Sequence, residues 1–269
     1  MLDKPQERHV YPKFHQLITR TALQRWQRIS GVEFSAETMA LIIQGSSQED
    51  APTWSRLQHW HFYRSQAAIA DWRWLHLTSE RRVRQLQEAL LTSRGQTAHW
   101  GYLGRLLHHL QDMSTPSHVI PVYHDPCFAD AYEVAMTAYQ PDWQHLALDT
   151  SLSPGEELDA LQRYTDAAQA SLAWLASDEA MLHGDCDGSP FPLPSNLFWQ
   201  APSTDQTGWL GFGRRGPLFS AFGQTELQYA QHRITVSRTE YQRIYHHFFR
   251  KAVTESTALI AWSQGGTAH

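Results

Sequence analysis

Residues Leu107–His118 read LHHLQDMSTPSH, and this stretch decides how the rest of the chain is interpreted. His108 and Asp112 are four residues apart, so on a helix they share one face and present two metal ligands together. Thr115-Pro116 predicts the end of that helix, because a residue before proline avoids helical dihedral angles. The turned chain can then bring back His118 as a third ligand. A His-x-x-x-Asp pair followed by Pro-x-His is far more specific for a metal site than the pair alone.

The hydrophobic pattern around this stretch predicts helices through most of the chain. Apolar residues recur three and four apart, as in Phe14-Leu17-Ile18 and Leu103-Leu106-Leu107-Leu110. Ser153-Pro154-Gly155-Glu156 and Ser237-Arg238-Thr239-Glu240 each place a serine cap three residues before a glutamate, which predicts a helix start at both positions. We expect helices near residues 12–29, 35–44, 66–75, 79–93, 97–112, 128–139, 154–177 and 238–262. The predicted fold is all-α, a single multi-helix domain over residues 1–269.

The region from His183 to about Arg233 departs from the helical pattern. Glycine and proline alternate there with aromatic residues, as in Phe191-Pro192-Leu193-Pro194, which predicts a long irregular excursion. Its aromatic content argues against disorder. Two interpretations stay open: the aromatics pack on the helical core, or they wall a substrate pocket and touch lipid. We expect His183-Gly184-Asp185 to form a turn.

Composition restricts the classes of function. The 42% hydrophobic content of this 269-residue chain suits an ordinary globular core. A net charge of −5, spread along the chain, predicts no basic surface for a nucleic-acid backbone. Cys127 and Cys186 have no C-x-x-C spacing and are expected to be unpaired thiols. The 16 His beside 27 Asp plus Glu favour metal ligation by imidazole and carboxylate.

The sequence gives no sign of a membrane span or an export signal. No stretch approaches the roughly 18 to 20 apolar residues of a transmembrane helix. The N-terminal segment carries Asp3, Lys4, Glu7 and Arg8, and it lacks the apolar centre of a signal peptide. We therefore expect a soluble protein with no export signal in the chain as given. A secreted or periplasmic location is possible if a leader was removed, so localisation stays open.

The motif resembles the metal-binding core of the bacterial zinc-dependent phospholipase C family, which is distantly shared with fungal single-strand-specific nucleases. The resemblance rests on His108-x-x-x-Asp112-x-x-Thr115-Pro116-x-His118 followed by Tyr132-Glu133. Upstream, Gly45-x-x-x-Glu49-Asp50 before Trp60-His61-Phe62-Tyr63 is similar to the family's acidic pair and aromatic segment. His15-Gln16-Leu17-Ile18-Thr19 is similar to its first-helix histidine. These blocks cover roughly the first half of the chain and imply a helical fold with a multi-metal hydrolytic site.

The resemblance implies a ligand set for two or three zinc ions. Asp50, His61, His108 and Asp112 would hold one zinc, and Asp112 would also reach a neighbouring zinc bound by His15. His118 and Glu133 would hold another. Such cations neutralise a phosphodiester and lower the pKa of the attacking water, whose proton Asp50 could accept.

The sequence departs from the family at two positions. The family places a histidine four residues before the glutamate that matches Glu133, but Ala129 stands there. His124 is our preferred replacement ligand because zinc favours imidazole, and Asp130, on the same helical face as Glu133, is the rival. The secreted relatives also use a processed N-terminal tryptophan, whereas this chain begins with Met1.

The remaining histidines are either candidate ligands or structural residues. Each taken alone, His15 and His61 would be interpreted as buried structural histidines. They become candidate ligands because several separate segments of the chain resemble the family. The histidines that match no block are expected at the surface or in the core; they are His59, His99, His109, His246 and His247. Trp60, Phe62 and Tyr63 are candidates for lining the substrate cavity.

Three functions are therefore compared. The first is phosphoester hydrolysis by a metal-activated water, with phospholipid as the first substrate by resemblance and peripheral membrane contact as a consequence. The second is a zinc-dependent nuclease, which is disfavoured by the lack of a basic track. The third is a non-catalytic zinc-binding protein with a degenerate site, motivated by Ala129 and Met1.

Overall fold

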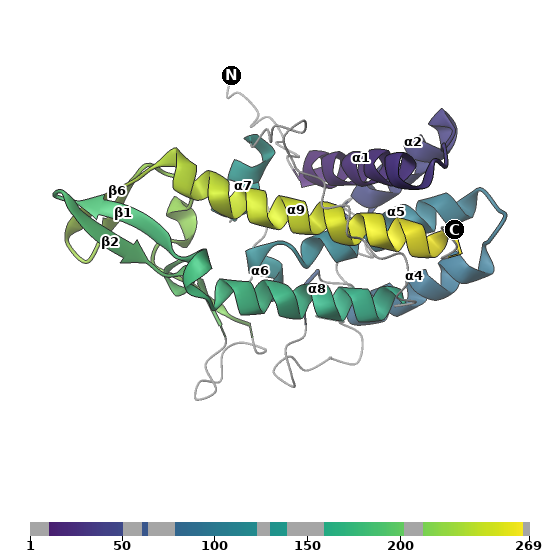
Figure 1. Cartoon of the computed structure of the whole chain (residues 1–269). Coiled ribbons are helices and arrows are strands. Elements are labelled where there is room, and N and C mark those ends of the chain that lie inside the picture. The colour runs from purple at the N-terminus through teal and green to yellow at the C-terminus, as the bar shows by residue number, and fades with distance from the viewer. Residues whose placement is uncertain are drawn as a thin grey trace, which may run out of the picture.

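A computed structural model describes residues 11–50, 61–63, 79–122, 130–138, 159–201 and 212–265, most of which are helical (Figure 1). The α-helices are α1 (Tyr11–Ser30), α2 (Ala36–Gln48), α4 (Glu80–Thr92), α5 (Ala98–Asp112), α6 (Pro116–Val119), α7 (Ala131–Ala138), α8 (Ala160–Leu175) and α9 (Arg238–Ser263). The predicted helical architecture is confirmed in outline, but the described residues also form a small antiparallel sheet.

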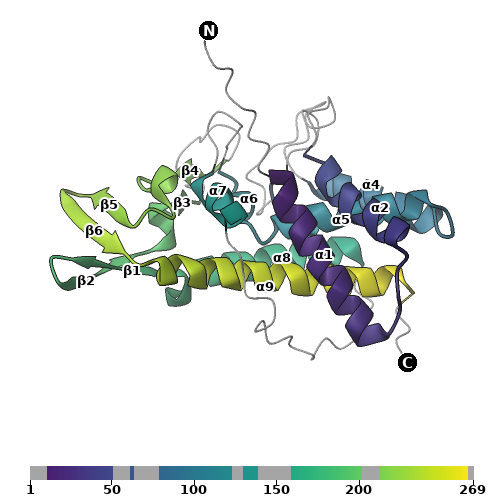
Figure 2. The same ribbon diagram turned by 90° about the horizontal axis from the view of Figure 1, so that it is seen from above.

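Helix α5 is the centre of the helical part. It contacts α1, α2, α4, α8 and α9, and α1 crosses α9 on one side of it (Figure 2). Its apolar face is buried as the periodicity predicts, but four polar side chains near its C-terminus are buried as well: His108, His109, Gln111 and Asp112. Buried polar groups cost free energy unless they are hydrogen-bonded or bind an ion. The last turn of α5 is therefore where a site is expected.

Two glycines let α2 approach α5 closely. A Cβ on Gly104 would lie 2.8 Å from Cα of Gly45 and would collide with the carbonyl oxygen of Ile42. Only a residue without a Cβ fits such a helix crossing. The crossing places Ser46, in the last turn of α2, and Asp50, just after this helix, next to His108 of α5.

The structure confirms one of the two predicted helix caps, the one at Ser237. The Ser237 side chain accepts a hydrogen bond from the Glu240 amide at the start of α9, as predicted. Helix α8 begins at Ala160, because Asp159 is extended and its side chain accepts from the amide of Gln162. The helix predicted over residues 154–177 is therefore interrupted at Asp159, and its start at residue 154 stays a prediction. Residues 153–158 and the helix predicted at 66–75 lie outside the described residues.

The irregular excursion predicted for residues 183–233 is also wrong, because this region contains strands. The four-stranded sheet has the order β2-β1-β6-β5, formed by β1 (Leu182–Cys186), β2 (Ser189–Leu193), β5 (Glu226–Tyr229) and β6 (His232–Val236). A second, two-stranded sheet pairs β3 (Trp199–Gln200) with β4 (Arg214–Arg215). The four-stranded sheet lies at one end of the molecule, beyond the start of α9 (Figure 1).

The predicted turn at His183-Gly184-Asp185 lies instead within strand β1. Leu182 and Gly184 are buried while His183 and Asp185 are exposed, which is the two-residue period of a strand. The turn follows at Asp187-Gly188, whose φ angles are 52° and 81°. Two consecutive left-handed residues form the tight turn that matches strand twist, so β1 and β2 make a hairpin.

The aromatic residues of this region pack on the core, which was the first of the two interpretations. Trp199 and Phe222 are 2% and 3% exposed, and both contact the ring of Tyr132 in α7. Phe212 is buried against Phe62. Trp209 lies outside the described residues. These contacts connect the sheet region to the helices that carry the candidate ligands.

Candidate metal centre

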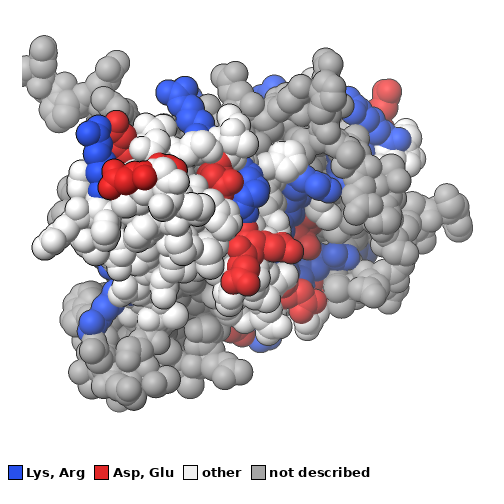
Figure 3. Space-filling view, turned by 60° about the vertical axis from the view of Figure 1, so that its left-hand side comes forward, with Lys and Arg blue, Asp and Glu red and all other residues white. Residues whose placement is uncertain are grey.

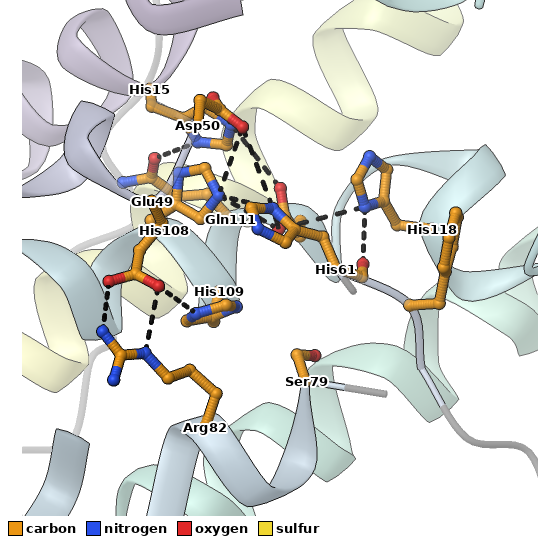
Figure 4. A network of polar contacts seen from close by, with 12 residues as sticks. His15, Glu49, Asp50, His61, Ser79, Arg82, His108, His109, Gln111 and His118 are labelled. Carbon is orange, nitrogen blue, oxygen red and sulfur yellow. Dashed lines mark hydrogen bonds and ion pairs between the residues drawn. The ribbon is translucent and has the colours of Figure 1, made fainter. Parts of the chain in front are cut away.

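Seven of the eight residues predicted as metal ligands lie close together, although they come from six separate segments. His15 is on α1, Asp50 follows α2, His61 is on the extended segment 61–63, His108 and Asp112 are on α5, His118 is on α6, and Glu133 is on α7. Figure 4 labels five of them: His15, Asp50, His61, His108 and His118. His124 lies outside the described residues, so its role stays a prediction.

Asp112 is the common neighbour of the histidines. Its Oδ1 lies 3.5 Å from Nε2 of His15. Its Oδ2 lies 3.1 Å from Nδ1 of His61 and 3.4 Å from Nε2 of His108. Nδ1 of His118 is 3.9 Å from the same Oδ2. One buried carboxylate therefore has four imidazoles around it.

Asp50 is a second carboxylate beside the same histidines. Its carboxylate oxygens lie 3.8 Å from ring nitrogens of His15, His61 and His108. The Asp50 side chain is 10% exposed, compared with 2% for Asp112. Asp50 is thus the carboxylate of this cluster that is more accessible to a water molecule.

Hydrogen bonds orient two of the imidazoles. Nδ1 of His108 lies 2.9 Å from the carbonyl oxygen of Ser46, and a carbonyl can only accept, so Nδ1 carries the proton. Nδ1 of His15 lies 2.9 Å from Oε1 of Gln111, whose amide nitrogen donates to Thr19 and Ser256. We therefore assign the proton of both rings to Nδ1. The lone pair of each Nε2 then points at the carboxylates, as in metal-binding histidines held by outer-shell partners.

The ring nitrogens of His61 and His108 are in direct contact within the cluster. Nδ1 of His61 lies 2.8 Å from Nε2 of His108, which bears a lone pair by the assignment above. The described residues contain three groups of side chains whose ligand atoms lie within 4.8 Å of one another. These groups are His15, His108 and Asp112; Asp50, His61 and His108; and His61, His109 and Asp112. Their nitrogen and carboxylate donors suit zinc and similar divalent ions.

Electrostatics keep the carboxylates charged in spite of their burial. Burial alone would raise the pKa of Asp112, but the neighbouring imidazoles, His108 and His118 first, hold it well below its usual value. Burial lowers the pKa of His61 to about 4, against the opposing effect of Asp112. The cluster thus combines charged carboxylates with a neutral imidazole of His61 at neutral pH, which is the protonation state that metal ligands need.

His118 forms a second pair beside this cluster. Its Nδ1 donates to the carbonyl oxygen of His61 at 2.6 Å, and its Nε2 lies 2.8 Å from Oε1 of Glu133. Burial opposes a charge on this ring, but Asp112 and Glu133 outweigh burial and raise the pKa of His118 to about 10. A cation bound by Nε2 would therefore have to displace the proton that this nitrogen shares with Glu133. Phe62 packs against His118 with ring centroids 5.5 Å apart, and Tyr63 is also buried.

The structure gives Asp130 another role at the start of α7. Its side chain is buried, and Oδ1 accepts a hydrogen bond from the backbone amide of Tyr132 at 2.9 Å. This contact orients the first turn of the helix that carries Glu133. The choice between His124 and Asp130 as replacement for the missing histidine at Ala129 is not tested, because residues 123–129 lie outside the described residues.

Four residues that surround the cluster were not predicted from the sequence. Gln111 orients His15, and Glu49 pairs with Arg82 and with His109. His109 was expected in the core or at the surface because it matched no block; it is fully buried and also adjoins the ligand cluster. The sequence signal for Glu49 and His109 was that each directly adjoins a predicted ligand, Asp50 or His108.

Comparison of the chain with protein-family models, curated proteins and solved structures finds no match. None of the helices in the described part of the chain has the length and apolarity needed to cross a membrane.

Proposed function

We propose that this protein is a zinc-dependent phosphoester hydrolase of the phospholipase C type. One observation carries the proposal: the buried carboxylate of Asp112 lies within 3.9 Å of ring nitrogens from four histidines. Such a concentration of imidazole and carboxylate is the donor set of hydrolytic zinc sites. The sequence resemblance described above supports the same class of enzyme.

The ligands divide into two neighbouring sets. His15, Asp50, His61, His108 and Asp112 would hold zinc in the main cluster, and His118 with Glu133 would hold a further ion. When bound, zinc lowers the pKa of a water molecule and neutralises the charge of the phosphoester oxygens.

Asp50 is the residue that we assign to proton transfer. Although burial opposes the charge, the imidazoles of His108, His15 and His61 lower the pKa of Asp50, so its carboxylate is ionised at neutral pH. Its greater exposure than Asp112 lets it contact the attacking water and accept its proton. Asp112, almost fully enclosed, is better suited to hold ligands in place.

Phospholipid is the first substrate that we propose, ahead of nucleic acid. On the face drawn in Figure 3, acidic and basic side chains of the described residues are interspersed, and they do not gather into a basic track. A backbone-binding nuclease normally needs such a track. The proposed lipid substrate rests on the resemblance, and it would require contact with a membrane surface.

The test is hydrolysis of bis(p-nitrophenyl) phosphate before chelation, after chelation and after zinc is restored. The proposal expects activity that chelation abolishes and zinc restores, because the metal generates the nucleophile. Activity that persists after prolonged dialysis against chelator would refute it. Bound zinc without hydrolysis of any activated phosphodiester would favour the non-catalytic alternative. Comparing phosphatidylcholine with single-stranded DNA then distinguishes the lipid substrate from the nuclease alternative.

A further inference from the structure

His109 is a fully buried histidine with one ring nitrogen that lacks a hydrogen bond. Its Nε2 lies 3.3 Å from Oε2 of Glu49. Its Nδ1 is buried and has no hydrogen-bond partner among the described residues. Buried ring nitrogens are normally hydrogen-bonded or bound to an ion, so this nitrogen requires an explanation.

The pairing of Glu49 decides which nitrogen of His109 carries the proton. Arg82 donates to both carboxylate oxygens of Glu49, from Nε to Oε2 at 3.0 Å and from Nη2 to Oε1 at 2.7 Å. This two-bond geometry identifies Glu49 as an ionised acceptor. His109 must therefore donate to it from Nε2, and its Nδ1 keeps a lone pair.

The ring of His109 adjoins the ligand cluster. Ligand atoms of His109, His61 and Asp112 all lie within 4.8 Å of one another. The rings of His61 and His109 meet edge to face, with centroids 5.1 Å apart (Figure 4). Because Nε2 is bonded to Glu49, Nδ1 is the nitrogen of His109 that is available to a cation.

We propose that His109 is a metal ligand that binds a divalent cation such as zinc through Nδ1, together with His61 and Asp112. Glu49 and Arg82 orient the ring, in the manner of a carboxylate that holds a metal-binding histidine. The inference rests on the proposed function only in its choice of zinc. His61 and Asp112 also face His108. A cation can therefore lie in one of two neighbouring positions, one beside His108 and a second beside His109.

The test uses a substitution that separates ligation from packing. In His109→Gln the side-chain amide can still donate to Glu49 in place of Nε2, but nothing replaces Nδ1. We expect this variant to fold like the wild type, by melting temperature and circular dichroism, and to bind zinc at least tenfold more weakly or with one ion fewer. Isothermal titration of metal-free protein with zinc measures both quantities.

The matched control is His99→Asn on the same helix. His99 is also buried, and its Nδ1 hydrogen-bonds the carbonyl oxygen of Leu90 at 3.0 Å. Asparagine can keep that bond, so zinc binding should equal that of the wild type. Glu49→Gln should weaken zinc binding about 10- to 100-fold, as outer-shell substitutions do. If His109→Gln fails to fold, Glu49→Gln decides the question.

The outcomes separate this inference from the proposed function. Unchanged zinc affinity and stoichiometry in both His109→Gln and Glu49→Gln would overturn the role of His109, whether or not the wild type hydrolyses phosphodiesters. If the wild type binds zinc but hydrolyses no phosphodiester, the proposed function is overturned. Weaker zinc binding by the variants would in that case still support His109 as a ligand. A wild type that binds no zinc would overturn both.

Discussion

Asp112 faces His15 with one carboxylate oxygen, Oδ1, which lies 3.5 Å from Nε2 of the histidine. The other oxygen, Oδ2, lies 3.1 Å from Nδ1 of His61 and 3.4 Å from Nε2 of His108. The two oxygens therefore face different imidazoles. A carboxylate in this position can bridge two cations, each bound to one oxygen.

Asp112→Asn should lose more bound zinc than His15→Ala and should lower turnover further. An amide keeps the size of the side chain but removes its charge, so it neither bridges two cations well nor offsets their mutual repulsion. The helical circular dichroism should remain largely intact. Mass spectrometry of metal content measures the difference, and equal losses in the two variants would show that Asp112 is a terminal ligand.

His118→Ala should lower both metal content and turnover. The substitution removes the imidazole that lies between Glu133 and Asp112, so the loss should exceed the roughly 10-fold lower limit seen for outer-shell partners. His232→Ala, in an exposed position of strand β6, is the control and should resemble the wild type. A His118→Ala enzyme with normal metal count and rate would remove this residue from the site.

Helix α5 could be predicted from the sequence because its apolar periodicity and the Thr115-Pro116 motif agree on where it lies and where it ends. The apolar residues of α5 set its buried face, and Thr115 is extended before Pro116, as the motif predicts. The proximity of His15 and His61 to this helix came from the resemblance. Periodicity says which face of a helix is buried but not which distant segment covers it.

The sheet was missed for reasons that lie in particular residues. The hairpin between β5 and β6 turns at Ala230-Gln231, both with positive φ, a pair that carries no turn signature. The other hairpin does carry one, Asp187-Gly188, but the prolines of β2 obscured the strand pattern beside it. His109 was missed because its partner Glu49 is distant in sequence and no spacing rule connects them.

Gly104→Ala should destabilise the protein by about 1–3 kcal/mol, the usual cost of overpacking. The added Cβ would collide with Ile42 and Gly45, so α2 must move away from α5 and carry Asp50 with it. Zinc affinity should fall for the same reason.

Gly101→Ala is the control on the same helix, since its Cβ would meet nothing within 4 Å. Thermal unfolding should show Gly101→Ala as stable as the wild type or slightly more so; equal melting temperatures for both variants would contradict the close crossing.

The metal-free protein should lose stability as the pH falls from about 6.5 to about 4, in part through His247. Burial first, and then the charge of Lys251, lower the pKa of His247 from 6.5 to about 4. Between these values the unfolded chain binds a proton that the folded chain does not, so acid favours unfolding. His247→Phe can keep the stacking on Trp174, whose ring centroid is 3.9 Å away, but cannot titrate. Urea unfolding at the two ends of this range should show a smaller acid loss in the variant; an identical loss would exclude His247 as a contributor.

The proposed metal centre is tested most directly by the metal content of the protein purified without chelator, measured by mass spectrometry. The convergence of His15, His61, His108 and His118 on Asp112 predicts roughly two or three zinc ions per chain, released by chelator and taken up again on addition of zinc. A folded chain that contains no stoichiometric zinc, and that binds none when zinc is supplied, would contradict the account.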